Sequence, residues 1–158
     1  MIEIDVQRFL RRAKDFEYSM KLCHDANSMG EVEFPATGRF RSNESLQSAA
    51  LLGIHAAISY VDALRIGLGD AELTADNHQE AAKRLKQVLV DRKVEDPKGV
   101  QRFSDLVSKK SAIAYGKGRT SESDLKWIIE GSQRFSVWIN QMGKQLNVEG
   151  WGHVGTEE

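Results

Sequence analysis

The chain has 158 residues and a formal net charge of −1, and its 41% hydrophobic and 28% charged residues are the balance of one globular domain. The single cysteine, Cys23, excludes an internal disulfide and a cysteine-based zinc site, and the acidic start is unlike a signal peptide. The most apolar stretch, 46–68, is interrupted by His55, Asp62 and Arg65 and is predicted to be a buried helix rather than a membrane span. We therefore expect one cytoplasmic domain, 1–158, with no membrane association, no metal and no other cofactor.

All the predicted elements are helices. The first covers about 4–27, where apolar residues recur at the three- and four-residue spacing of one buried helix face. Residues 28–42 show no helical period and contain Gly30, Pro35 and Gly38, so we expect a loop there. A loop of this length is uncommon inside a compact domain and is often functional.

The second predicted helix begins at Ser42 or Asn43, either of which can cap it, and continues to about Leu68. It is rich in alanine and glycine, so we expect neighbouring helices to approach it closely. His55 and Asp62 are seven residues apart, about two turns, and therefore share one face of this helix. Two interpretations stay open: a satisfied polar pair in the core, or a polar pocket at the centre of the bundle.

The third predicted helix starts after Thr74 or Asp76 and ends near Asp91, and the fourth runs from Pro97 to Gly116. Proline suits the first turn of a helix because its missing N–H would have no partner there. Both helices carry apolar residues at helical spacing, which predicts that they pack against the rest of the bundle.

The fifth predicted helix covers about 120–146 and has a capping-box-like pattern at its start. Trp127 and Trp138 are eleven residues apart, about three turns, so they share a face beside the apolar one. We interpret them as dimer-face candidates or core contacts. Residues 148–158 are rich in glycine and are predicted to form a flexible tail. These elements predict an all-α, antiparallel up-and-down bundle of about five helices.

Charge is unevenly distributed along the chain. Residues 83–119 hold eleven Lys or Arg and four acids, a net charge of +7, which leaves −8 for the remainder. Such a basic segment favours an anionic partner. The alternative is that its basic helices pair with acidic neighbours inside the same bundle, and both interpretations stay open.

The four histidines form no metal-binding pattern in the sequence. His24, His55, His78 and His153 are not spaced as two ligands one helical turn apart, and no H-E-x-x-H is present. The glycine-rich phosphate-binding loop of nucleotide-binding enzymes is also absent from the sequence. These patterns predict neither a zinc site nor a nucleotide-hydrolysing one.

Three segments carry a family resemblance. The Ala-rich helix AALLGIHAAISYVDAL at 49–64 has an aromatic residue within it, and NHQE at 77–80 places a His-containing turn before an apolar-basic helix. KKSAIAYG at 109–116 places a basic residue, a spacer and a polar ring residue before a glycine. Together, across about 45–145, they resemble HEPN-type domains (higher eukaryotes and prokaryotes nucleotide-binding). The resemblance implies a helical bundle of that family's kind.

Many HEPN-like proteins are metal-independent ribonucleases with an Arg, four to six residues and then a His on one helix, contributed by both chains of a dimer. There the His transfers a proton at the ribose 2′-OH or the leaving oxygen, and the Arg stabilises the charge on the phosphorane. No histidine of this chain has an Arg at that distance before it, and the nearest counterparts are Lys110 and Tyr115. Lys lacks the two-pronged guanidinium, and Tyr, with a pKa of ~10, is a poor base at neutral pH.

The resemblance, with its catalytic motif missing, implies a non-catalytic HEPN-like binding module. It also implies that the chain forms a homodimer. As a further partner it implies RNA, a nucleotide or a nucleotidyltransferase protein. This hypothesis predicts Lys110 and Tyr115 at a shared cleft that lacks an imidazole acid–base group. The candidate anion-binding residues are Arg102, Lys109, Lys110, Lys117 and Arg119.

Two alternatives remain. One is a metal-independent ribonuclease of a toxin–antitoxin pair, with Lys110 and Tyr115 as catalytic candidates in altered roles. The other is a structural homodimer or immunity-like interaction protein with Trp127 and Trp138 at its interface.

Overall fold

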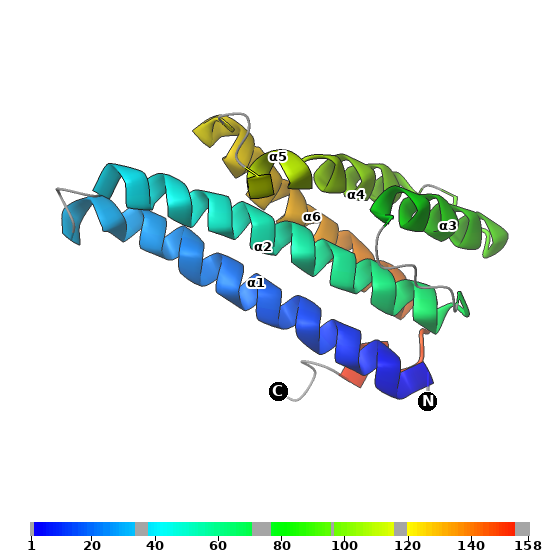
Figure 1. Cartoon of the computed structure of the whole chain (residues 1–158). Helices are drawn as coiled ribbons and strands as arrows, with labels where there is room; N and C mark the ends of the chain where they lie inside the picture. Colours follow the sequence, from blue (N-terminus) through cyan, green and yellow to red (C-terminus); the bar gives the residue numbers. More distant parts are fainter. Residues whose placement is uncertain (1, 34–37, 71–76, 96, 116–119, 154–158) are drawn as a thin grey trace.

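The computed structural model describes residues 2–33, 38–70, 77–95, 97–115 and 120–153, and these ranges contain helices and no strand (Figure 1). The helices are α1 (Ile2–Glu33), α2 (Gly38–Gly67), α3 (His78–Asp91), α4 (Lys98–Ser108), α5 (Lys110–Tyr115), α6 (Glu122–Gln145) and the 3-10 turn η1 (Trp151–His153). The predicted all-α fold is confirmed.

Two long helices, α1 and α2, lie side by side and form the base of the bundle (Figure 1). Their 32 and 30 residues correspond to lengths of roughly 45–48 Å. A Cβ added at Gly67 would lie 3.3 Å from Val6 Cγ2, and one added at Gly53 would lie 3.0 Å from Met20 Sδ. Residue numbers therefore rise along one helix as they fall along the other.

Gly53 also lets α6 approach α2, which places three helices in close contact. A Cβ at this position would lie only 2.5 Å from Ser132 Oγ of α6. The prediction that the small residues of α2 permit close approach is therefore confirmed. Because α2 packs against α1 on one side and α6 on the other, most of it is buried.

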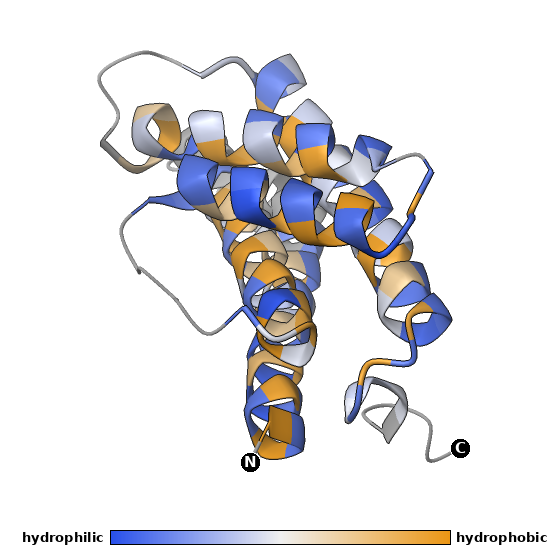
Figure 2. Cartoon of the chain, turned by 90° about the vertical axis from the view of Figure 1, so that its right-hand side faces the viewer, coloured by the Kyte–Doolittle hydropathy of each residue, from blue (hydrophilic) through white to orange (hydrophobic). Residues whose placement is uncertain are grey.

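The apolar character of α2 follows from this central place. By length and composition alone, Ser45–Gly67 is apolar enough to cross a membrane. However, 67% of its apolar window is buried inside the bundle, as expected for the core helix of a helical domain. Figure 2 shows hydrophobic and hydrophilic residues on different sides of the helices, and the buried hydrophobic residues form one continuous core.

The predicted loop at 28–42 is wrong for most of its length, because α1 continues to Glu33 and α2 begins at Gly38. Only 34–37 lie outside the described residues. The glycines in this segment, among them Gly30, lower helix propensity by about 1 kcal/mol each relative to alanine. Such a penalty weakens a helix without preventing it, so counting glycines overstated the length of the connection.

On the other side of α2 from α1, α3 and α4 pack against each other (Figure 1). The predicted start and end of α3 are confirmed, and Asn77 caps it by accepting a hydrogen bond from the Glu80 N–H at 3.0 Å. The capped start of α6 is confirmed as well, since Ser121 Oγ accepts from the Asp124 N–H at 3.1 Å. Side-chain caps thus set the first residue of α3 and the first residue of α6.

The predicted fourth helix is divided at Lys109, where α4 ends and α5 begins. Ser108 Oγ donates a hydrogen bond of 2.6 Å to the carbonyl of Asp105 in the preceding turn. A serine that bonds back to its own helix competes with the backbone ladder and bends it. The break turns α5 towards α2, against which it packs.

The predicted flexible tail at 148–158 is wrong over its first part. Val148 and Trp151 are buried, and Trp151 is only 3% exposed. Its indole lies on Gly143 of α6, where an added Cβ would come within 2.1 Å of the ring. Glycine content indicated fraying, but the large apolar area of a tryptophan holds this segment on the bundle. The residues after 153 lie outside the described part of the chain.

Candidate functional site

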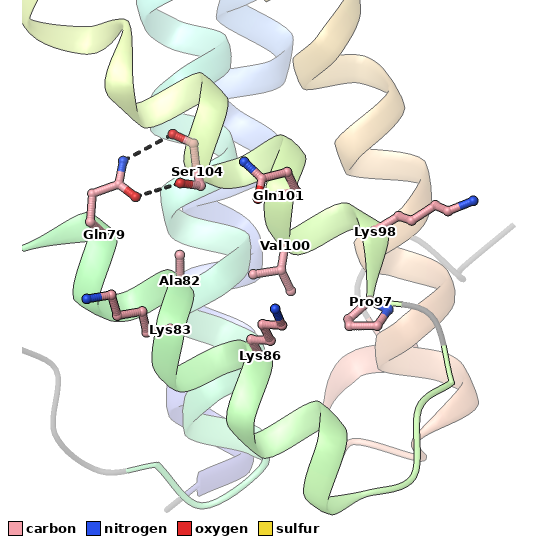
Figure 3. A pocket seen from close by; sticks show the side chains of 9 residues that line it. All are labelled: Gln79, Ala82, Lys83, Lys86, Pro97, Lys98, Val100, Gln101 and Ser104. Carbon is pink, nitrogen blue, oxygen red and sulfur yellow. Dashed lines mark hydrogen bonds between the residues drawn. The ribbon is translucent and has the colours of Figure 1, made fainter.

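A groove of about 440 Å³ lies between α3 and α4 (Figure 3). Three lysines line it, and the described residues of its lining include no carboxylate. The residues of this lysine groove are Gln79, Ala82, Lys83, Lys86, Pro97, Lys98, Val100, Gln101 and Ser104. On each helix they recur every three or four residues, so one stripe of α3 faces one stripe of α4.

Two reciprocal hydrogen bonds close one end of the lysine groove. Gln79 Nε2 donates to the Ser104 carbonyl at 3.1 Å, and Ser104 Oγ donates to Gln79 Oε1 at 2.6 Å (Figure 3). They join the first turn of α3 to the last turns of α4. The two walls of the groove are therefore held in a fixed relation at this end.

The basic segment 83–119 was predicted either to bind an anionic partner or to pair with acidic residues of the same bundle, and each interpretation applies to different residues. Arg84 is paired internally, with Asp70 at 3.2 Å and Glu80 at 3.8 Å. Lys83 and Lys86, in contrast, are exposed and form no ion pair within the described residues. Internal pairing therefore neutralises part of the segment, and the lysine groove stays basic.

The residues predicted to bind anions are only partly described. Arg102 is half-buried on α4, Lys109 is exposed at the end of α4, and Lys110 is half-buried on α5. Lys117 and Arg119 lie outside the described residues, as does the side chain of Tyr115 at the end of α5. The three groove lysines were missed, although Lys83 and Lys86 at a one-turn spacing were a detectable signal.

The expectation of a cleft at Lys110 without an imidazole acid–base group stays a prediction, although the charge of Lys110 acts on His55. His55 of α2 is half-buried, and its ring stacks on Phe16 with centroids 5.3 Å apart. Burial lowers the pKa of His55, and the charges of Lys110 and His78 lower it further. Both charges therefore disfavour the protonated form of His55. A histidine with a lowered pKa is mostly neutral at pH 7 and can accept a proton.

His55 and Asp62 do not form the predicted polar pair, since no hydrogen bond or ion pair joins these two described residues. His55 faces Phe16, whereas the charges that act on Asp62 are those of Arg65 and Arg12. Burial raises the pKa of Asp62 to about 6, and the two arginines oppose this rise. Asp62 is thus a half-buried carboxyl that is stabilised in its protonated form.

Asp62→Asn is expected to stabilise the protein at pH 7.5 and to have little effect near pH 4. The folded pKa of about 6 lies above the unfolded value of ~3.9, so the contribution of Asp62 to stability is lost as pH rises through that window. After discounting for partial solvent exposure, we expect a gain of about 1–2 kcal/mol at the higher pH. Urea unfolding at both pH values measures it, and an equal gain at both would contradict the assignment.

A polar network that the sequence did not reveal lies around Tyr60. Ser136 Oγ donates to Glu17 Oε1 at 2.6 Å, and Trp151 Nε1 donates to Asn140 Oδ1 at 3.2 Å. Burial and the neighbouring Glu17 raise the pKa of Tyr60 to about 12. Tyr60 therefore keeps its proton at neutral pH, and the network connects α1, α2, α6 and η1 without acid–base chemistry.

The two tryptophans of α6 both face α4 but differ in availability. Trp138 is half-buried, and its indole covers Gly99, where an added Cβ would lie 2.1 Å from the ring. Its ring centroid is 5.6 Å from that of Phe135, so it packs within its own chain. Trp127 is 48% exposed and lines a second groove, between α4 and α6. Of the two dimer-face candidates, Trp127 is the more exposed.

The lysine groove and His55, whose pKa is lowered by burial and by the charges of Lys110 and His78, are the two candidate sites. Within the described ranges, no group of three or more His, Cys, Asp or Glu is placed to hold a metal ion. Comparison of the chain with models of protein families, with curated proteins and with solved structures finds no match in any of the three.

Proposed function

We propose that this chain is a helical RNA-binding module and that the lysine groove holds the sugar-phosphate backbone. The observation that carries the proposal is a groove with Lys83, Lys86 and Lys98 in its lining and no carboxylate among its described residues. Contacts between cationic side chains and phosphates supply most of the affinity and the salt dependence of nucleic-acid binding. Gln79 and Gln101 add amide groups that can hydrogen-bond to sugar hydroxyls.

A polymer suits this groove better than a free nucleotide does. All three lysines are exposed, and they come from two helices on the outer side of the bundle. Small-molecule sites instead bury most of their ligand in a concave pocket. We further propose that the bundle has the HEPN-like, antiparallel up-and-down order that the resemblance of 45–145 implies, which is consistent with RNA as a partner.

The triple variant Lys83→Gln, Lys86→Gln, Lys98→Gln is expected to weaken binding of a single-stranded RNA by tenfold or more, at about 50 mM salt. Its plot of log affinity against log salt should be less steep by about 2, since each single-strand phosphate contact contributes about 0.7 to the steepness. Fluorescence anisotropy with a labelled RNA of about 12 nucleotides, between about 50 and 200 mM salt, measures both quantities.

The matched control is Arg11→Gln, Lys21→Gln, Lys144→Gln, which removes the same charge from exposed positions outside the lysine groove. It is expected to bind within about threefold of the wild type, because only non-specific charge is lost. Wild-type affinity that does not change with salt would overturn the proposal. So would an equal loss of affinity in the two triple variants.

A second candidate is a metal-independent ribonuclease, and the effect of the Lys110 and His78 charges on the half-buried His55 favours it. A neutral His55 can take a proton from a ribose hydroxyl, while an ammonium stabilises the charge that develops on the phosphate. Electrophoresis of RNA incubated with the wild type, His55→Gln, Lys110→Gln and Tyr115→Phe decides between binding and cleavage. Intact RNA with the wild type, or equal cleavage by all four proteins, removes this candidate.

A further inference from the structure

A second groove, of about 390 Å³, lies between α4 and α6. Its described lining includes Lys98, Arg102 and Asp105 from α4, and Trp127, Glu130 and Arg134 from α6. We call it the tryptophan groove. Its two helices approach closely at Gly131, where an added Cβ would lie 3.4 Å from Leu106 Cδ2. The groove is therefore a shallow channel with an exposed indole at its side.

The tryptophan groove and the lysine groove meet at the start of α4. Lys98 and Gln101 belong to the lining of both. A chain that leaves the lysine groove at these two residues enters the tryptophan groove across the first turns of α4. The two grooves are therefore adjacent at the start of α4.

The charge of the tryptophan groove differs from that of the lysine groove. Asp105 and Glu130 stand among its three cations, and the Asp105 carboxylate accepts a hydrogen bond of 3.0 Å from Gln101 Nε2. Two carboxylates repel phosphates, so this groove suits an uncharged group that offers hydrogen-bond donors and acceptors. A nucleobase is such a group, with amino and carbonyl edges and a flat face.

A nucleobase in the tryptophan groove also explains why the indole of Trp127 is exposed. Trp127 is 48% exposed, and Arg102 and Arg134 lie in the same groove. Aromatic side chains inside a positively charged groove are the platforms on which single-stranded nucleic acids stack their bases, and guanidinium planes stack on bases as well. Lys98, Asp105 and Glu130, in contrast, are of residue types that are depleted from the core of a protein–protein interface.

We propose that the tryptophan groove receives an unpaired RNA base that stacks on Trp127, while the lysine groove holds the adjoining phosphates. The inference rests on the proposed RNA binding and names its substrate class, which is single-stranded rather than double-stranded RNA. The bases of a duplex are already stacked and paired, so placing one in the groove costs the energy of unstacking.

The test compares wild type, Trp127→Ala and Trp127→Phe with a labelled single-stranded RNA and with its duplex. The wild type is expected to bind the single strand more tightly. Trp127→Ala should lose about tenfold in affinity for the single strand and none for the duplex, and Trp127→Phe should keep most of the affinity. Intrinsic fluorescence should be quenched by the single strand in the wild type and much less in Trp127→Phe. Val137→Ala, on the same helix at a 61% exposed residue outside the groove, is the control and should bind as the wild type does.

The failures of the two proposals are distinguishable. Loss of binding in the groove-lysine triple variant with unchanged affinity in Trp127→Ala would overturn the stacking subsite and leave the RNA-binding proposal standing. Equal wild-type affinity for single strand and duplex would also overturn the stacking subsite and leave the RNA-binding proposal standing. Absence of any salt-dependent RNA binding would overturn both. Light scattering that shows a dimer for the wild type and a monomer for Trp127→Ala, with RNA affinity unchanged, would assign the indole to a second copy of the chain instead.

Discussion

Asp70→Asn is expected to lower the free energy of unfolding by about 3 kcal/mol, because it removes a hydrogen-bonded counter-charge from a buried arginine. Arg65 of α2 is only 1% exposed, and its Nε donates to Asp70 Oδ2 at 2.9 Å. Arg84 of α3 donates to the other carboxylate oxygen at 3.2 Å. One carboxylate thus joins the end of α2 to α3, and with it the wall of the lysine groove to the core.

The control for this prediction is Lys126→Gln. Lys126 and Glu122 form an ion pair of 3.2 Å whose side chains are 54% and 60% exposed. Exposed pairs contribute little, so we expect a change within about 0.5 kcal/mol. Urea unfolding followed by circular dichroism measures both variants. Asp70→Asn with the stability of Lys126→Gln would show that Arg65 does not depend on this carboxylate.

The helical fold was predictable because its signals are local. Ser121 caps α6 through the Asp124 N–H, and the spacing of apolar residues located the helices, with α4 and α5 predicted as one. The predictions from sequence were wrong where tertiary packing outweighs local propensity. Trp151 holds a glycine-rich segment on the bundle by covering Gly143, and no feature of residues 148–158 alone indicates that contact.

The candidate site was predictable only as a charged segment. Whether a cation is neutralised depends on what lies opposite it in the fold. Arg84 meets Asp70, whereas its neighbour Lys83 faces the lysine groove. The effect of Lys110 on His55 joins residues far apart in sequence, on two helices that pack against each other in the fold. Spacing motifs on a single helix do not detect such an interaction.

Gly143→Ala is expected to destabilise the protein by about 2 kcal/mol, although alanine is the better helix former by about 1 kcal/mol. A Cβ at Gly143 would lie 2.1 Å from Cδ2 and Cε2 of Trp151 and 2.5 Å from its Cγ. These atoms belong to a rigid ring that is 3% exposed, so the indole has to leave its place or α6 has to shift. Either movement costs more than the gain in helix propensity.

Gly131→Ala, in the same helix, is expected to stabilise the protein instead. Its Cβ would lie 3.4 Å from Leu106 Cδ2, which is an ordinary contact, so the propensity gain of up to about 1 kcal/mol remains. Urea unfolding of both variants checks the signs, and the combination of Gly143→Ala with Trp151→Ala checks the cause. If the indole is the obstacle, the double variant loses less than the sum of the two single losses. Stabilisation by both alanines would mean that Trp151 does not cover Gly143.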